Sequence, residues 1–513
     1  MSFSFSQNTA VEILHAAMMR SFGAPLRLSL MGNCTIAHCS QDSSWQRGAP
    51  PRGKLLVFGP PEADMTSALG IAQSTPYSAW AELDICAPAN GDIPYNQSPG
   101  YLRYGEHSLL GGLSCAMRKR PFTRFDYADE WNNLGFGRIR TDGSIWAAHG
   151  GFTAEKATEL AGAYNQHMGE EAHCGAYMTL FDTPKASVLW CSRPVGPVDS
   201  TEWSVIERFV SDWRSDHLPC LPCLCQTPYG YQCIVTMRLD CDEDVGSARD
   251  IFTWYEGQGI PFSLAVKTSL ALGPADLALL EDVRRAEGTL LSHTHTHQYN
   301  WGSSIEGVTH EATASRRWFA ETWPDTPPPD LAVSPFHTNP SYAVQGMIQA
   351  GFAGFVSGII HNDPEYLLGR AGIVPFADGK IVSISQQSML HGDCYSRQGK
   401  SVRAHVDAFA AQYAARGIFG YLDHPFSTRY QYDWESKEQR LQAHQQLISA
   451  IRKHKNILFW PQQECFDFVK ALGAVRLLVS STGAVSVVST TKRNDIVYRY
   501  KGCEYRINDG ISL

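Results

Sequence analysis

From residue 230 to residue 471 the chain alternates short apolar runs with longer amphipathic segments. The runs have the length and composition of buried strands, and the longer segments have the apolar spacing of helices. Strands that alternate with helices pair in parallel, because each helix returns the chain to the same end of the sheet. The pattern predicts an α/β fold, a distorted (β/α) barrel of seven or eight strands, with its site at the C-terminal strand ends.

The expected elements fill the whole of this part of the chain, which we call the barrel region (residues 230–473). Strands are predicted at 234–239, 262–266, 289–291, 331–333, 354–356, 381–384, 418–422 and 457–460. Helices are predicted at 246–257, 274–286, 306–321, 340–350, 401–416, 437–453 and 462–471.

Residues 1–217 have a less regular pattern and are predicted to form an N-terminal α/β or α+β domain. Helices are expected at 1–28, 154–168 and 200–213, and strands at 54–58 and 187–192. No residue of this domain indicates what it binds.

Residues 218–229 are rich in proline and cysteine and are predicted to be a linker. Cys220, Cys223 and Cys225 could hold a structural zinc ion, but no second Cys-x-x-Cys completes a set of four ligands. Buried free thiols are the alternative. Residues 474–513 contain further short apolar or alternating runs, and we expect a small antiparallel β unit there.

The composition excludes some classes of protein. A hydrophobic content of 43% and a charged content of 18% are typical of a globular chain with large cores. A net charge of −8, without a long run of Lys or Arg, argues against nucleic-acid binding. No segment approaches the roughly 20 apolar residues of a membrane span. The N-terminus has no secretory pattern and the cysteines form no compact framework, so we expect a cytoplasmic protein.

Acidic residues directly follow the first predicted strand of the barrel region. Asp240, Asp242, Glu243 and Asp244 lie within five residues of one another. Carboxylates beside a buried strand are unfavourable unless they bind metal or transfer protons. The alternative is a solvated acidic turn that caps the next helix, which suits Glu243 and Asp244 better than Asp240.

Three histidines, His293, His295 and His297, follow the third predicted strand. Neutral imidazole is a common zinc ligand, and two histidines four residues apart can reach one ion if the chain turns after the strand. In an extended segment His295 points away from the other two, so we expect it to have a packing role. The alternative is a histidine-rich surface segment.

Other strand ends also carry polar groups. His337 follows the strand at 331–333, and Asp423 and His424 follow the strand at 418–422. His391 is a further candidate for the pocket. Each group alone has a structural explanation, but together at one edge of a barrel they indicate a catalytic site.

Residues 230–471 resemble the NodB-homology polysaccharide deacetylases, carbohydrate esterase family four. That family has an Asp-Asp pair after the first strand, a His-[Ser/Thr]-x-x-His motif, an Arg-x-Pro-aromatic segment and a late Leu-x-His. Here residues 293–297 fit the second motif and Leu422-Asp423-His424 fits the last. Asp240-Cys241-Asp242 is similar to the first motif.

Two departures from the family pattern leave questions open. One residue is inserted between the two carboxylates, so either Asp242 or Glu243 could be the metal ligand. Pro335-Phe336 fits the third motif, but Val333 occupies the position of its arginine. We expect Arg238 or Arg429 to take over the role of that arginine.

The resemblance implies one divalent metal ion, zinc above all, held by Asp242, His293 and His297. Asp240 is then the general base, and His424 is the acid that protonates the departing amine.

The remaining site residues are implied with less specific roles. A backbone N–H near Phe336 is expected to stabilise the oxyanion, and Asp423 to tune His424. Arg238 and His337 complete the residues expected around substrate.

The function implied is a metal-dependent N-deacetylase of an amino sugar. For a cytoplasmic enzyme we expect an N-acylated precursor of a bacterial surface polysaccharide, such as O-antigen lipopolysaccharide or capsule. One alternative is a degenerate deacetylase that serves as a carbohydrate-binding or scaffold protein. Another is a related amidohydrolase that removes a different acyl group.

Overall fold

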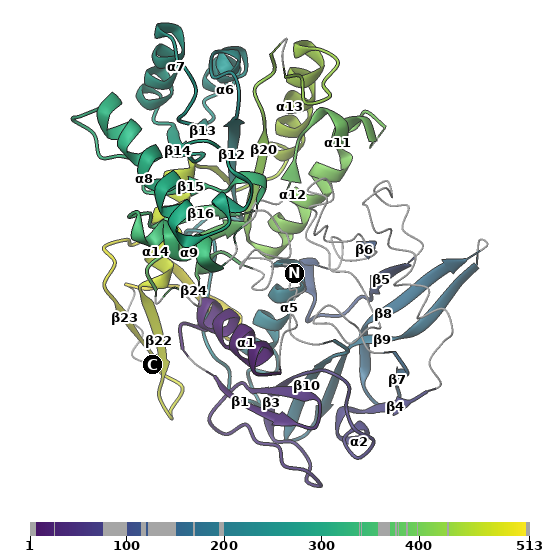
Figure 1. The fold of residues 1–513 in the computed structure, drawn as a ribbon. Helices are drawn as coiled ribbons and strands as arrows, with labels where there is room; N and C mark the ends of the chain where they lie inside the picture. The colour runs from purple at the N-terminus through teal and green to yellow at the C-terminus, as the bar shows by residue number, and fades with distance from the viewer. Residues whose placement is uncertain are drawn as a thin grey trace.

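The computed structural model describes residues 7–24, 26–74, 100–113, 120–121, 150–167, 170–193, 200–337, 339, 341–357, 370–374, 377, 379–385, 388–397, 399–427 and 430–508. Two large sheets dominate it: one in the barrel region, and one in the N-terminal domain (Figure 1).

The sheet of the barrel region is built on β12 (Cys233–Cys241), of which every residue is buried. Such burial is expected of a parallel strand covered on both faces. Eight strands run parallel in the order β18-β16-β15-β14-β13-β12-β20-β19. Their bounds are β13 (Ser263–Val266), β14 (Thr289–Ser292), β15 (Leu331–Val333), β16 (Gly354–Ser357), β18 (Val382–Ser385), β19 (Ser388–Met389) and β20 (Ile418–Asp423).

The remaining two strands lie outside this row. β21 (Ile457–Phe459) pairs with the start of β12, and β17 (Gly372–Ile373) pairs antiparallel with β18. The sheet curls, but within the described residues its two edges, β17 and β19, do not pair. The α/β class is therefore confirmed, whereas a closed barrel stays a prediction.

Helices follow the strands and cover the sheet (Figure 1). The bounds of the longer ones are α6 (Arg249–Gly257), α7 (Pro274–Arg285), α8 (Ile305–Thr322), α9 (Ser341–Gln349), α12 (Arg403–Ala415), α13 (Lys437–Ile451) and α14 (Gln462–Gly473). Short helices lie at η3 (Gly246–Ala248), η4 (Tyr299–Gly302), η5 (Pro335–His337) and α11 (Gly392–Arg397).

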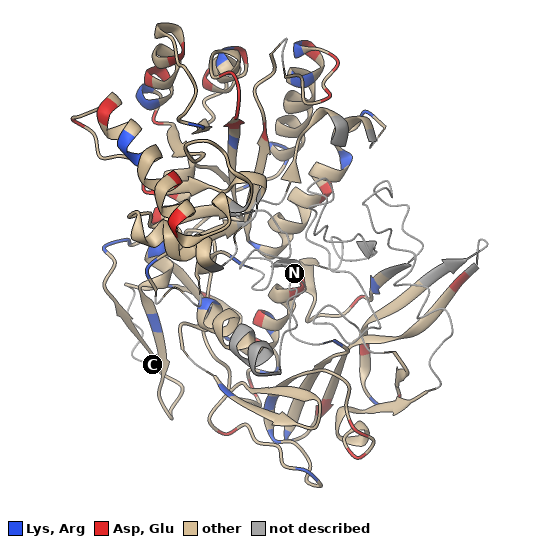
Figure 2. Ribbon diagram, in the orientation of Figure 1, with Lys and Arg blue, Asp and Glu red and all other residues tan. Residues whose placement is uncertain are grey.

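Local sequence fixes where several of these helices begin. Ser304 and Ser436 cap α8 and α13, each accepting a hydrogen bond from a backbone N–H three residues on. Charged residues of both signs occur along helices α7 and α8 (Figure 2). Within the described part of the chain, none of the helices combines the length and apolarity needed to span a bilayer.

The N-terminal domain contains an eight-stranded mixed sheet in the order β1-β2-β3-β10-β9-β8-β5-β6. Helices α1 (Gln7–Phe22) and α5 (Ser200–Ser211) pack against it and share its core. The strands are β1 (Arg27–Met31), β2 (Cys34–His38), β3 (Gly53–Phe58), β5 (Gly100–Tyr104), β6 (Arg120–Pro121), β8 (Thr158–His167), β9 (Glu170–Thr183) and β10 (Ala186–Cys191). Smaller elements are α2 (Thr66–Leu69), β4 (Ile71–Gln73), η1 (Gly111–Leu113) and β7 (Phe152–Ala154).

The helix predicted at 154–168 is wrong. β7 and β8 occupy this segment, and β8 lies between β5 and β9. Register shifts between Glu159 and Tyr164 interrupt the two-residue alternation. Leu160, Ala161 and Ala163 are all buried, which gives the segment the apolar spacing of a helix. The predicted strands at 54–58 and 187–192 and the helix at 200–213 are confirmed.

Most of segment 218–229 is buried, while Pro219 and Tyr229 are exposed. Its β11 (Cys223–Leu224) pairs with β24 (Val497–Tyr500), which pairs with β25 (Cys503–Arg506). β22 (Val475–Val479) and β23 (Val485–Ser489) form a separate hairpin, so the predicted C-terminal unit is two sheets.

The three cysteines of this segment are buried free thiols. Within the described residues they form no group with metal-ligand spacing, which supports the buried-thiol interpretation.

Buried polar contacts join the N-terminal domain to the barrel region. Arg370, beside β17, forms an ion pair with Glu207 of α5 and donates to Ser21 Oγ at 3.2 Å. Arg20 of α1 donates from Nε to the carbonyl oxygen of Ile373 at 2.9 Å. The side chain of Arg370 is 1% exposed, so these charges are paired in the interior, as buried charges must be.

Candidate metal centre and catalytic site

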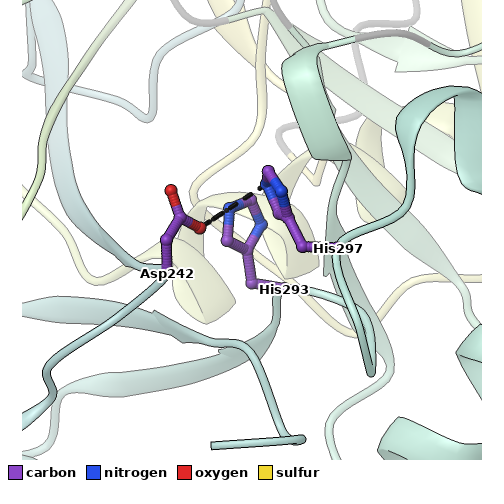
Figure 3. A group of neighbouring side chains, drawn as sticks. All are labelled: Asp242, His293 and His297. Atoms are coloured by element: carbon purple, nitrogen blue, oxygen red, sulfur yellow. Dashed lines mark ion pairs between the residues drawn. The ribbon is translucent and has the colours of Figure 1, made fainter.

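Asp242, His293 and His297 converge at the C-terminal edge of the parallel sheet (Figure 3). Asp242 follows β12, and both histidines follow β14. Oδ1 of Asp242 lies 3.0 Å from Nε2 of His293 and 3.5 Å from Nε2 of His297. The ligand atoms of all three residues lie within 4.8 Å of one another, which is close enough for one ion.

A tight turn brings the two histidines to the same point. Thr294 and His297 have positive φ angles of 62° and 61°, and Thr294 Oγ1 accepts a hydrogen bond from the His297 N–H at 2.9 Å. Glu311 of α8 accepts hydrogen bonds from the backbone N–H groups of His295 and Thr296, at 3.2 and 2.7 Å. These hydrogen bonds hold the loop in its strained backbone conformation.

His295 lies apart from the other two histidines. Its Nδ1 is 3.1 Å from Oγ1 of Thr268, and in the described residues it belongs to no metal-ligand group. This position fits the packing role expected from the sequence.

The chemistry of the three converging groups fits a divalent cation. His293 Nδ1 donates to the carbonyl oxygen of Val333 at 3.0 Å, so in the neutral ring the lone pair of Nε2 faces Asp242. Oδ1 of Asp242 is buried and accepts no hydrogen bond. Burial and His293 lower the pKa of His297 to about 4, so its ring is neutral at pH 7. With the His293 ring neutral, the three groups offer electron-pair donors to one point, which is the donor set that a divalent cation binds.

The alternative ligand, Glu243, points elsewhere. Its carboxylate lies 3.9 Å from Nζ of Lys267, and it is absent from the group formed by Asp242 and the histidines.

Arg238 and Asp240 form a buried bidentate ion pair beside this group. Nε of Arg238 donates to Oδ1 of Asp240 at 2.7 Å, and Nη2 donates to Oδ2 at 3.1 Å. Burial raises the pKa of Asp240, but Arg238, His293 and His424 together outweigh it and the pKa is lowered. Arg238 is therefore the arginine that contacts Asp240, and Arg429 lies outside the described residues.

His424, after β20, reaches the same centre. Its Nε2 lies 3.3 Å from Oδ2 of Asp242, and its Nδ1 lies 2.6 Å from Nε2 of His391. Burial lowers the pKa of His424, but the carboxylates of Asp242, Asp240 and Asp423 together outweigh it and the pKa is raised.

Tyr432 belongs to the site but carries no sequence signal. Its ring stacks on His424, with centroids 4.1 Å apart, and its hydroxyl donates to Oδ2 of Asp242 at 3.2 Å. It lies in the loop between β20 and α13, where neither spacing nor motif distinguishes it from the neighbouring tyrosine.

Asp423 lies behind His424 and is not part of the group formed by Asp242, His293 and His297. It is fully buried, and its oxygens accept hydrogen bonds from His424 N, Trp434 Nε1, Arg440 Nε and His444 Nε2. These donors hold the Asp423 carboxylate behind His424. The negative charge of Asp423 helps to raise the pKa of His424.

Phe336 is exposed and lies beside His297. Its ring centroid is 4.8 Å from that of His297 and 5.4 Å from that of Tyr299. Phe336 and Tyr299 are 45% and 63% exposed, which is unusual for large aromatic side chains. The side chain of His337 lies outside the described residues.

No protein-family model matches this sequence, and no curated protein matches it. Solved structures resemble slightly less than half of this chain. A family 4 carbohydrate esterase from Streptomyces lividans is 14% identical (TM-score 0.30; 45% of this chain, 92% of that chain). The chitin deacetylase from Colletotrichum lindemuthianum is 12% identical (TM-score 0.33; 47% and 89%). The PuuE allantoinase is 11% identical (TM-score 0.37; 47% and 92%).

Proposed function

We propose that this protein is a metal-dependent hydrolase of the carbohydrate esterase family four type, which removes an N-acetyl group from an amino sugar. The observation that carries the proposal is the convergence of Asp242, His293 and His297 beside Asp240, whose pKa is lowered, and His424, whose pKa is raised. These are the groups that amide hydrolysis needs: a cation site, a base and an acid.

Asp242 Oδ1, His293 Nε2 and His297 Nε2 would hold the ion. When bound, a divalent ion such as zinc lowers the pKa of water and polarises an amide carbonyl. The hydrogen bond from His293 Nδ1 to Val333 keeps that ring in the tautomer that a ligand requires.

Asp240 would accept the proton of the attacking water. Arg238 keeps the carboxylate ionised and fixes its orientation through two hydrogen bonds. Because its pKa is lowered, the Asp240 carboxylate is a weak base. It can take a proton only from a water whose own pKa is lowered, as a bound divalent ion would do.

His424 would give a proton to the departing amine. The carboxylates around His424 raise its pKa, and in the charged ring the proton at Nε2 faces the centre. Nδ1 then donates to Nε2 of His391, which requires His391 to carry its own proton on Nδ1.

The exposed rings of Phe336 and Tyr299 support a carbohydrate substrate, because sugars pack their apolar faces on aromatic side chains. We further propose an N-acetylated precursor of a bacterial surface polysaccharide as the substrate. A panel of free, nucleotide-linked and lipid-linked N-acetyl amino sugars tests the proposed substrate.

The deciding experiment combines metal analysis with acetate release from that panel. We expect about one zinc ion per chain, and turnover that a chelator abolishes and zinc restores. Protein that neither contains a divalent ion nor takes one up would contradict the proposal.

The Asp240→Asn variant separates an enzyme from a degenerate binding protein. An enzyme loses acetate release but keeps its metal, whereas a binding module shows no acetate release in either form. Glu243→Gln is the matched control, since Glu243 pairs with Lys267 away from the centre.

A further inference from the structure

Lys54 and Cys220 form a buried amine–thiol pair outside the site described above. Lys54, on β3, is 0% exposed. Its Nζ lies 2.9 Å from Sγ of Cys220 and 3.4 Å from the carbonyl oxygen of Val210. Within the described residues, no carboxylate lies at ion-pair distance from this Nζ. A buried ammonium ordinarily has a carboxylate partner. For Lys54 the nearer of these two polar neighbours is instead the thiol of Cys220.

A cavity of about 680 Å³ gives small molecules a route to this thiol. Cys220 lines the cavity, which lies between the N-terminal domain, the segment 218–229 and the C-terminal sheets. Arg27 and His38 contribute from one side, and Leu477 and Lys501 from the other. The mixed polar and apolar lining is compatible with entry of a small polar oxidant such as hydrogen peroxide.

The contact distance suits a reaction between the two groups. Reacting atoms held about 3–3.5 Å apart are close to an attack geometry, and Nζ and Sγ are nearer than this. Lysine has a flexible side chain, so Nζ can move onto the sulfur while its β-strand stays in place.

We propose that Lys54 and Cys220 form a peroxide-sensitive covalent cross-link. In the first step the sulfur attacks a peroxide oxygen and the O–O bond breaks. The thiol becomes a sulfenic acid and one water leaves, so sulfur is oxidised by two electrons and peroxide is reduced. In the second step the ammonium of Lys54 first loses one proton to solvent, and the resulting amine attacks Sγ. An S–N bond forms and the S–O bond breaks, and the hydroxyl leaves as a second water with a proton taken from the amine.

The cross-link would join β3 to the segment that leads into β12, the strand of Asp240. The two residues are 166 positions apart in sequence, so closing this loop restricts the unfolded chain and stabilises the folded one. The inference is independent of the proposed hydrolase activity.

The test is mass spectrometry of the full-length protein, digested without reductant after exposure to graded hydrogen peroxide. We expect one new peptide pair that contains Lys54 and Cys220 and weighs two hydrogens less than the sum of the separate peptides. Dithiothreitol should separate the pair again, and the melting temperature should rise with cross-linking and fall on reduction. The exposed thiol of Cys503 reports that the oxidant was active.

Two variants provide controls. Lys54→Met removes the nucleophile but keeps the length of the side chain, so Cys220 should oxidise further to sulfinic acid without a cross-link. Cys220→Ser should give no cross-link. If either variant fails to fold, the wild-type spectrum still decides.

Oxidised Cys503 without any Lys54–Cys220 pair would overturn the proposal. A disulfide from Cys220 to another cysteine, or a linked pair with an additional oxygen, would contradict the direct S–N bond.

Discussion

Arg238 and Asp240, two residues apart on β12, form an ion pair in which both side chains are only 1% exposed. Successive side chains of a strand alternate between its faces, so Arg238, Asp240 and the following Asp242 project to the same side. Cys241, between the two aspartates, is buried on the other side in the core. The inserted residue therefore keeps both carboxylates at one site.

Replacing Arg238 with Met is expected to destabilise the protein by about 3–5 kcal/mol, because it leaves the buried Asp240 carboxylate unpaired. Urea unfolding followed by circular dichroism measures the change. The double variant Arg238→Met/Asp240→Asn removes the uncompensated charge and should recover part of the loss. A single variant as stable as wild type would show that the pair is not buried in solution.

Asp240→Asn is expected to lower kcat for acetate release by about 10²–10⁴-fold, the contribution usual for a general base. The asparagine cannot accept the proton of the water, but it fills the same space. Zinc content, measured by elemental analysis, should stay at the wild-type value. Concurrent loss of zinc would instead make Asp240 a metal ligand.

His293→Gln or Asp242→Asn should remove stoichiometric zinc binding, since each takes away one of three ligands. Dialysed protein is assayed by elemental analysis and by the thermal shift that added zinc produces. His295→Gln is the matched control on the same loop, because His295 faces Thr268. If His295→Gln lost zinc as completely as His293→Gln, the assigned ligand set would be incorrect.

His391→Gln should lower kcat by about 10- to 100-fold with little change in KM. A hydrogen bond to a charged group contributes about 1.5–3 kcal/mol, and His391 makes such a bond to His424. Steady-state kinetics on the best substrate of the panel measures both constants. A rise in KM alone would place His391 in substrate binding.

The free energy of unfolding should decrease as the pH falls from about 6.5 to about 4. Burial, and next the charge of His444, lower the pKa of His405 from 6.5 to about 4. Over that range the unfolded chain binds a proton that the folded protein does not, so acidification favours unfolding, by up to about 3 kcal/mol. Urea titrations at several pH values measure the slope, which should be shallower in His405→Gln. An equal slope in that variant would assign the effect to other groups.

Local pattern was sufficient to predict most of the barrel region. The strands of the site and the helices α7, α8 and α13 lie within a few residues of their predicted bounds. Burial periodicity is a local property, and parallel pairing then brings the polar groups at strand ends to one edge of the sheet. For this reason the sequence alone could propose Asp240, Asp242, His293, His297 and His424 as one site.

Tertiary structure decided what depends on contacts between distant segments. β8 became a strand because β5 and β9 pair with it on both sides. The orientation of Glu243 towards Lys267, the partnership of His391 with His424 and the stacking of Tyr432 join residues from different loops. No local pattern encodes these contacts, because each depends on how the strands and helices pack around the centre.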